Sequence, residues 1–230
     1  MAFGIALSFG ADAGRRRSRR ALSSGVDAGR RWSRRWDVAE DNLPGVLSRL
    51  GVAQLPPAPY VGGMYVPLVS IEPGAAGGRD LLYVSGHPPL ESDGEKILGV
   101  CYHTADPAAH AAMVRVAQRA AAHNALAILA TVRAELGTLN RVRRLVKSLA
   151  MVNVCASPEQ NAWRGDGPPP ASFASHPDVM NGYSLVMADV FGHDAGIGAR
   201  SAVGMSLPNG IATEVEAIFE LEDEEAFGLL

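Results

Sequence analysis

The chain has 230 residues, of which 47% are hydrophobic and 20% are charged, and its net charge is −3. This length and balance are typical of one or two globular domains and exclude collagen-like and low-complexity proteins. No apolar run approaches the roughly 18–20 residues of a membrane-spanning helix, so we expect no membrane partner.

The charge is unevenly divided along the chain. Residues 1–36 carry nine arginines against Asp12 and Asp27, a formal charge of about +7, which leaves about −10 for the remainder. An acidic folded part does not favour a duplex nucleic acid as the partner.

Residues 1–40 predict a disordered basic extension. The sequence DAGRRRSRR, which begins at Asp12, returns as DAGRRWSRR from Asp27. Such a segment buries too little apolar surface to offset the entropy of ordering it. It is interpreted as a transit peptide for a mitochondrion or plastid, as a basic arm for RNA, membranes or nuclear import, or as a duplication without a role. Without a transit function the protein is expected in the cytoplasm.

The first elements are short. A helix is predicted over Leu43–Leu50, and the proline-rich stretch Leu55–Pro59 ends any helix there. Runs rich in β-branched and aromatic residues, bounded by glycine and proline, predict strands. These runs are Met64–Ile71, Leu81–Ser85 and, as a possible third strand, Lys96–Tyr102.

The next element is a long helix. Asp106 and Pro107 form a typical helix start, and the helix is predicted to end at Leu136, before Gly137. Its apolar positions recur at steps of three and four and form one alanine-rich stripe suited to packing on a sheet. The stripe consists of Val114, Ala117, Ala121, Ala125, Ile128, Val132 and Leu136.

The second half predicts a strand at Arg144–Val154, a loop, a helix from Pro177 to Gly192, and strands at Arg200–Ser206 and Ile211–Leu221. Asn209-Gly210 favours a reversal between the last two strands. In the last strand Thr213, Val215, Ala217, Phe219 and Leu221 alternate with a mostly acidic set. We expect the acidic tail Glu222–Leu230 to fray.

Strands with two interspersed helices favour a single mixed sheet with both helices on one face. The other face of the sheet then needs a cover. This predicts oligomerisation through that face.

Several segments together resemble the RidA/YjgF family, once called the L-PSP endoribonuclease family. They occur in the family's order and nearly its spacing over residues 43–222, and residues 223–230 form an acidic tail beyond them. The segments are LYVSG from Leu82, Asn124-Ala-Leu126 with Leu136-Gly137, Asn181-Gly-Tyr183, ARSAVG from Ala199, Leu207-Pro208 and EVEAI from Glu214.

The resemblance implies an α/β (α+β) fold like that of chorismate mutase, a mixed sheet with two helices on one face, assembled as a homotrimeric barrel. It implies sites in the clefts between subunits. It also implies hydrolysis of reactive 2-imino and enamine acids to 2-oxo acids and ammonia, with neither metal nor cofactor. The expected partner is a small carboxylate-bearing imine or a related metabolite.

The resemblance assigns Arg200, Glu214 and Asn181 to the site. Arg200 occupies the family's substrate-binding position, and its planar fork suits a carboxylate. Glu214 would orient or deprotonate the attacking water, and Glu216 on the same strand face would raise the pKa of Glu214 in an enclosed site. Asn181 would bind the imine nitrogen or a substrate oxygen.

Ser85, Gly86 and Tyr65 are the remaining candidates. Ser85 and Gly86 end a strand near the family's substrate pocket, where a hydroxyl or backbone N–H can help. Tyr65 is assigned to the cleft wall. Arg200, Glu214 and Asn181 also have ordinary interpretations, as a surface ion pair, a solvated strand face and a helix-surface residue.

The chain departs from the family's pattern at several places. Ala202 stands two residues after Arg200, where many competent deaminases carry cysteine, and His87 stands where glutamine is usual. The Arg200-to-Pro208 interval is one residue shorter, and the loop Glu159–Ser172 is enlarged. These departures favour the alternative of a non-catalytic trimer that binds metabolites or acts as a chaperone. Ribonuclease activity is a third possibility, which the acidic domain disfavours.

The histidines and cysteines show no spacing typical of metal ligands, so no metal site is expected.

Overall fold

The computed structural model describes residues 38–59, 64–71, 79–155 and 171–222. Residues 1–37 of the predicted extension, residues 156–170 of the enlarged loop and the tail 223–230 lie outside these ranges. Within the described ranges, no helix is long and apolar enough to cross a membrane.

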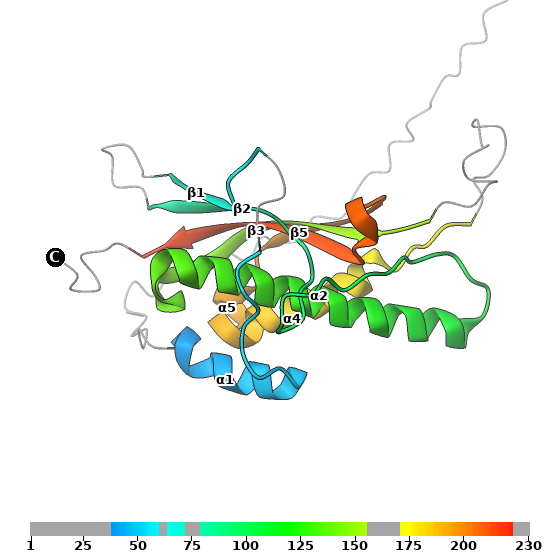
Figure 1. Ribbon diagram of the computed structural model, residues 1–230, viewed down its shortest axis with the longest axis horizontal. Helices are drawn as coiled ribbons and strands as arrows, with labels where there is room; N and C mark the ends of the chain where they lie inside the picture. The colour runs from blue at the N-terminus through cyan, green and yellow to red at the C-terminus, as the bar shows by residue number, and fades with distance from the viewer. Residues whose placement is uncertain (1–37, 60–63, 72–78, 156–170, 223–230) are drawn as a thin grey trace, which may run out of the picture. The chain divides into compact units, whose positions relative to one another are not determined.

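A five-stranded mixed sheet forms one layer of the domain, and the helices lie on one side of it (Figure 1). Its strand order is β1-β2-β5-β3-β4, with β3 and β4 parallel and every other pair antiparallel. The predicted mixed sheet is therefore confirmed. The strands are β1 (Leu68–Ile71), β2 (Leu81–His87), β3 (Val142–Asn153), β4 (Ala199–Met205) and β5 (Thr213–Leu221).

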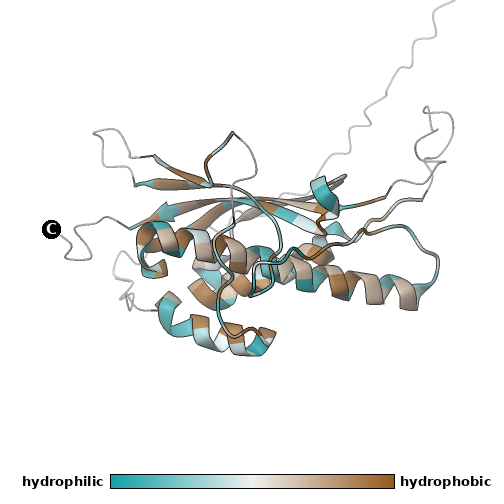
Figure 2. Cartoon of the chain, viewed as in Figure 1, coloured by the Kyte–Doolittle hydropathy of each residue, from teal (hydrophilic) through white to brown (hydrophobic). Residues whose placement is uncertain are grey.

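Two helices, α2 (Pro107–Leu136) and α4 (His176–Phe191), cover one face of the sheet, as predicted (Figure 1). The side chain of Asp106 accepts a hydrogen bond from the Ala108 N–H at the start of α2, and Gly137 ends the helix at a φ of 74°. Both caps agree with the sequence, because an acid at the N-cap and glycine in the left-handed region satisfy the helix ends. Much of α2 is tan and brown in Figure 2, since alanines fill its buried stripe.

A further helix, α1 (Val38–Leu50), packs against α4 on the side away from the sheet (Figure 1). It begins five residues before the predicted Leu43. The Glu40 N–H donates to Asn140 Oδ1 at 3.0 Å, and the Glu40 carboxylate accepts from the Leu139 N–H at 2.9 Å. These partners lie about a hundred residues away, so local sequence could not reveal this first turn. The short helices are η1 (Leu139–Arg141), α5 (His193–Gly196) and η2 (Pro208–Gly210).

The alternation predicted for the last strand is confirmed and defines the two faces of the sheet. Thr213, Val215, Ala217, Phe219 and Leu221 are buried on the helix-side face. The intervening Glu214, Glu216, Ile218 and Glu220 therefore lie on the opposite face, which we call the open face.

Apolar side chains are exposed on the open face. Val69 and Tyr83 pair across β1 and β2, and Val203 and Met205 lie on β4 in register with the open-face positions of β3. These four side chains are between 36% and 48% exposed. An exposed apolar sheet face of this kind is typical of a surface that is buried against another protein surface.

The predicted third strand at Lys96–Tyr102 is wrong. The segment makes only isolated bridges, Leu90 with Lys96, Leu98 with Ile211, and Cys101 with Val154. It passes from one neighbour to another without forming a continuous ladder. The run of Met64–Ile71 also becomes a strand only from Leu68.

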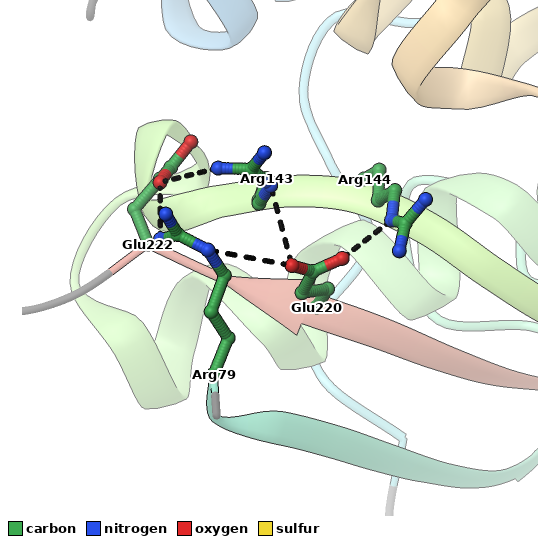
Figure 3. A network of polar contacts seen from close by, with 5 residues as sticks. All are labelled: Arg79, Arg143, Arg144, Glu220 and Glu222. Atoms are coloured by element: carbon green, nitrogen blue, oxygen red, sulfur yellow. Dashed lines mark hydrogen bonds and ion pairs between the residues drawn. The ribbon is translucent and has the colours of Figure 1, made fainter. Parts of the chain in front are cut away.

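An ion-pair network ties the strand ends together at the end of β5 (Figure 3). Glu220 bonds to all three arginines of the network, at 3.5 Å from Arg79 and 3.2 Å from Arg143, with Arg144 in closer contact. Glu222 bonds to Arg79 and Arg143 at 3.0 and 3.4 Å and is only 5% exposed. The expectation that the tail frays from Glu222 is therefore wrong at this residue, since these charges hold it.

Candidate functional site

A β-bulge at the end of β2 shapes the candidate site. Val84 pairs with Ala217 on β5, but the next pair is His87 with Val215, so β2 holds one extra residue. Ser85 and Gly86 occupy this bulge. Bulges often re-aim backbone and side chains next to active sites, because the extra residue interrupts the ladder.

Gly86 makes room for the carboxylate of Glu214. A Cβ atom at Gly86 would lie 2.1 Å from Oε1 and 3.0 Å from Cδ of Glu214. The carboxylate thus lies directly against the Gly86 backbone, and no other residue type fits at this position without moving Glu214.

The carboxyl of Glu214 is half-buried and shifted in its acidity. Burial raises its pKa above the ordinary value, and the charge of Glu216 raises the pKa further. Both causes disfavour the carboxylate form. The like-charge effect predicted for this pair is the second cause, and burial is the larger one. A raised pKa makes the carboxylate of Glu214 a stronger base, which suits it to accept a proton.

Glu214 faces a pocket of about 940 Å³. Tyr65, Ser85 and Gly86, all assigned from the sequence, line this pocket. The Ser85 hydroxyl donates to the Val66 carbonyl at 2.8 Å. The other lining residues are Pro57, Ala58, Pro59, Pro67, His87, Pro88, Leu90, Asp93, Gly94, Lys96, Pro208, Asn209, Ile211 and Glu216.

His87 anchors the bulge to helix α2. Its ring is 1% exposed, with Nδ1 at 2.7 Å from the Ser85 carbonyl and Nε2 at 2.8 Å from the Thr131 hydroxyl. Because a carbonyl only accepts, Nδ1 carries the hydrogen of the neutral ring. Burial lowers the pKa of His87, which favours that neutral form.

Asn124 ties the same bulge to β5. Its Nδ2 donates to the His87 carbonyl at 2.7 Å, and its Oδ1 accepts from the Thr213 hydroxyl. Thr213 directly precedes Glu214. Helix α2 therefore fixes both the backbone under Glu214 and the start of the strand that carries it.

Arg200 lies on the edge strand β4 and turns toward helix α4. Its guanidinium donates to the Ser184 hydroxyl at 2.8 Å, the Pro177 carbonyl at 3.1 Å and Asn181 Oδ1 at 3.3 Å. Arg200 and Asn181, predicted to share a site, are thus neighbours. Partial burial lowers the pKa of Arg200, and the guanidinium stays charged at any neutral pH.

No carboxylate forms an ion pair with Arg200 in the part of the chain that the structure describes. Arg200 interacts electrostatically with the phenol of Tyr183, which is fully buried and hydrogen-bonded to Ser148 at 3.1 Å. Burial raises the pKa of Tyr183, so the phenol is neutral. A half-buried guanidinium without a counterion suits an anionic ligand.

Arg200 and Glu214 lie on opposite faces of the sheet. Arg200 pairs with Ser148 and through it with Ala217, a helix-side residue, whereas Glu214 is on the open face. Strand β3 also separates their two strands. Within one chain these side chains do not meet, and Arg200 and Asn181 do not line the pocket of Glu214.

The sequence did not reveal the roles of His87, Thr131 and Asn124. His87 lies 44 residues before Thr131 and 37 residues before Asn124 in the sequence, so no local pattern connects them. The one available signal was polarity: His123, Asn124 and Thr131 are buried polar residues on an otherwise apolar helix stripe. Such residues need partners.

No family model matches the chain, but a sequence relative and several solved structures are similar to it. Protein TCP17 of Trypanosoma cruzi is 34% identical over 187 residues, which cover 81% of this chain and 98% of TCP17. The crystal structure of Atu1372 from Agrobacterium tumefaciens, a protein of unknown function, is 32% identical with a TM-score of 0.58. That match covers 82% of this chain and 98% of Atu1372.

A Shewanella oneidensis protein, described as a candidate endoribonuclease, shares the fold at 22% identity and a TM-score of 0.58. The match covers 77% of this chain and 98% of that protein. In this fold, the sequence motifs that resemble the family lie at the bulge of β2, on α4, on β4 and on β5. The chain belongs to the RidA/YjgF family. The predicted family and its chorismate-mutase-like fold are therefore confirmed.

Proposed function

We propose that this RidA/YjgF protein hydrolyses 2-imino acids to 2-oxo acids and ammonia, at sites shared by neighbouring protomers of a homotrimer. The observation that carries this proposal is the half-buried guanidinium of Arg200, which lacks a carboxylate partner among the described residues. An anion-binding arginine and a proton-exchanging glutamate are the two groups that this reaction requires.

Arg200 binds the carboxylate of the substrate. Ser184 and the Pro177 carbonyl hold the guanidinium plane, so its orientation is set before the ligand arrives. The N–H groups of this fixed guanidinium that these contacts leave free donate to the carboxylate, which positions the adjacent imine carbon. Asn181, in contact with Arg200, places its amide beside the bound acid.

Glu214 activates the water. In the carboxylate form it accepts a proton from water while the oxygen bonds to the carbon of the protonated imine. This attack gives a neutral carbinolamine and a protonated Glu214, which passes the proton to the carbinolamine nitrogen. As the C–N bond breaks, ammonia leaves, and the hydroxyl gives its proton to Glu214 while its oxygen becomes the ketone. Ammonia then takes this proton and departs as ammonium. One water is consumed, and the charge of the iminium ends on ammonium.

A second protomer supplies the missing half of each site. The exposed apolar side chains of the open face, Val69, Tyr83, Val203 and Met205, favour burial against another copy of the same face. Trimerisation would bring the edge strand β4 of one protomer beside the pocket of its neighbour. Arg200 and Asn181 would then come from one chain and Glu214, Ser85 and Gly86 from the next.

A second function is favoured by Ala202. This residue on β4 has no polar side-chain atom two positions from Arg200, where many competent deaminases of the family carry cysteine. Binding of a carboxylate metabolite without turnover needs only Arg200 and the pocket. A trimer that binds metabolites, or acts as a chaperone, is therefore the alternative.

The test generates an imino acid in situ with an amino-acid oxidase and measures the release of oxo acid and ammonia. We expect wild-type protein to exceed buffer, and Arg200→Ala to reduce this excess by about 100-fold or more, the usual effect of losing a charged contact made in the transition state. Arg200→Lys keeps the charge without the fork and should remain strongly impaired. No excess over buffer with several imines would support the binding function instead.

A further inference from the structure

Five prolines line the pocket of Glu214. They are Pro57, Pro59, Pro67, Pro88 and Pro208. Ala58, Leu90 and Ile211 extend the same apolar lining. Proline rings are rigid and carry no N–H, so this wall offers shape and apolar contact but no backbone donor at these positions. We call Pro57, Ala58 and Pro59 the strap.

The strap is held at its first residue. It follows helix α1, and the buried Pro56 directly precedes it. Gly94, at a φ of +91°, accepts Pro57 so closely that a Cβ at Gly94 would lie 2.9 Å from Pro57 Cγ. A proline wall held in this manner is preformed, and a ligand loses little free energy in ordering it.

Both polar and apolar residues line the pocket. Besides Glu214, the polar lining residues include Ser85, Asp93, Lys96, Asn209 and Glu216, whereas the prolines offer only apolar surface. A substrate's reacting carbon belongs beside Glu214. Its side chain is then the part available to the apolar lining.

In one protomer the pocket measures about 940 Å³, and a neighbouring protomer would close part of it. Its proline wall is therefore the feature that bears on the size of the substrate. A methyl side chain would leave the proline wall in contact with water. A branched or aromatic side chain would cover it, at about 25 cal/mol for each Å² of apolar surface removed from water.

We propose that the preferred substrate is a 2-imino acid with a bulky apolar side chain, branched aliphatic or aromatic, and that the strap sets this preference. This inference rests on the proposed function, because it concerns the same site. It adds the chemical class of the side chain and the segment that recognises it.

The test compares imines generated in situ by a broad-specificity L-amino-acid oxidase from phenylalanine, leucine and alanine. Semicarbazide traps the free imine, so a fall in semicarbazone reports enzymatic hydrolysis. We expect kcat/KM for the phenylalanine and leucine imines to exceed that for the alanine imine by about 10-fold or more, as apolar pockets achieve for added methylene groups.

Two variants and a matched control test the strap itself. Ala58→Trp fills the pocket and should lower kcat/KM for the bulky imines by about 10-fold, with the alanine imine within about two-fold. The double variant Pro57→Ser, Pro59→Ser removes apolar surface without adding volume and should also weaken the preference. Ala53→Trp places the same ring on an exposed residue of the same segment that does not line the pocket, and should change nothing.

The outcomes separate the two proposals. Absence of hydrolysis with all three imines would overturn the proposed function. Hydrolysis with equal or greater preference for the alanine imine would overturn only the inference about the side chain. A bulky preference that survives both strap variants, shown by circular dichroism to be folded, would contradict the role of the strap.

Discussion

Glu214 and Gly86 form the smallest unit of the site. The glycine permits the close approach of the carboxyl, and burial together with Glu216 shifts the acidity of that carboxyl. Neither effect exists without the other strand, because the bulge of β2 places Gly86 beside β5.

The pH dependence of kcat/KM tests the raised pKa of Glu214. If Glu214 acts as a base, kcat/KM rises as pH rises through its pKa, which burial and then Glu216 hold above the ordinary value. Glu216→Gln removes the second cause, so the pKa of Glu214 falls toward its ordinary value. We expect the acid limb of the pH–kcat/KM profile to move to lower pH. An acid limb that stays in place or moves upward would contradict this assignment.

A methyl group added at Gly86 tests how closely the carboxyl of Glu214 must approach the backbone. Gly86→Ala places a methyl group on the carboxyl of Glu214, which must move. We expect kcat/KM to fall by about 10- to 100-fold, because displacements of about 1 Å in a site can cost that much. The control is Gly45→Ala in helix α1, where nothing lies within 4 Å of the added Cβ. It should leave activity unchanged and stabilise the protein by about 0.4–1 kcal/mol in urea unfolding.

At the scale of elements, α2 supports the site from behind. Thr131 and Asn124, both on its buried part, bind the bulge through His87, and Asn124 also reaches Thr213 on β5. Three elements are held by one buried polar network. Such networks are costly when one partner is removed.

Replacing Thr131 tests this support. Thr131→Val keeps the shape but leaves Nε2 of His87 without its partner, and we expect a loss of about 1–3 kcal/mol in the free energy of unfolding. Thr131→Ser retains the hydroxyl and should stay closer to wild type. Urea denaturation of both variants decides the matter: equal stability of the two would show that the hydroxyl contributes nothing.

The elements also show what sequence reasoning could reach. Local signals were sufficient for α2, whose Asp106 cap and Gly137 end are encoded within a few residues, and for β5, whose burial alternates strictly. They failed at Lys96–Tyr102, because Leu98 and Cys101 pair with partners far along the chain. They failed equally at the start of α1, which Asn140 and Leu139 hold.

The candidate site divides in the same way. The sequence motifs named Arg200, Asn181, Glu214, Ser85 and Gly86, and the structure groups them into two sets. That the sets lie on opposite faces depends on the register of β3 with both neighbours, which no local pattern contains. The contact of Pro57 with Gly94 is long-range as well, so the stretch Leu55–Pro59 could only be interpreted as a helix end.

At the scale of the whole molecule, the proposed assembly joins these two sets. The open face exposes apolar side chains on β1, β2 and β4, and the two sets of site residues become one site only across a subunit boundary. A homotrimer with cyclic symmetry forms such a boundary three times. Its mass in solution is accessible to light scattering, where a stable monomer at micromolar concentration would remove the shared site.

The most direct measurement mixes two inactive proteins. Arg200→Ala and Glu214→Gln are unfolded together in equal amounts and refolded, so that mixed trimers form. Each mixed trimer would contain one intact pair of Arg200 and Glu214 on adjacent protomers, about a quarter of the wild-type number of sites over the whole mixture. We expect about a quarter of the wild-type imine hydrolysis to return. Wild-type protein that survives the same refolding, beside a mixture that stays inactive, would contradict a site shared between protomers.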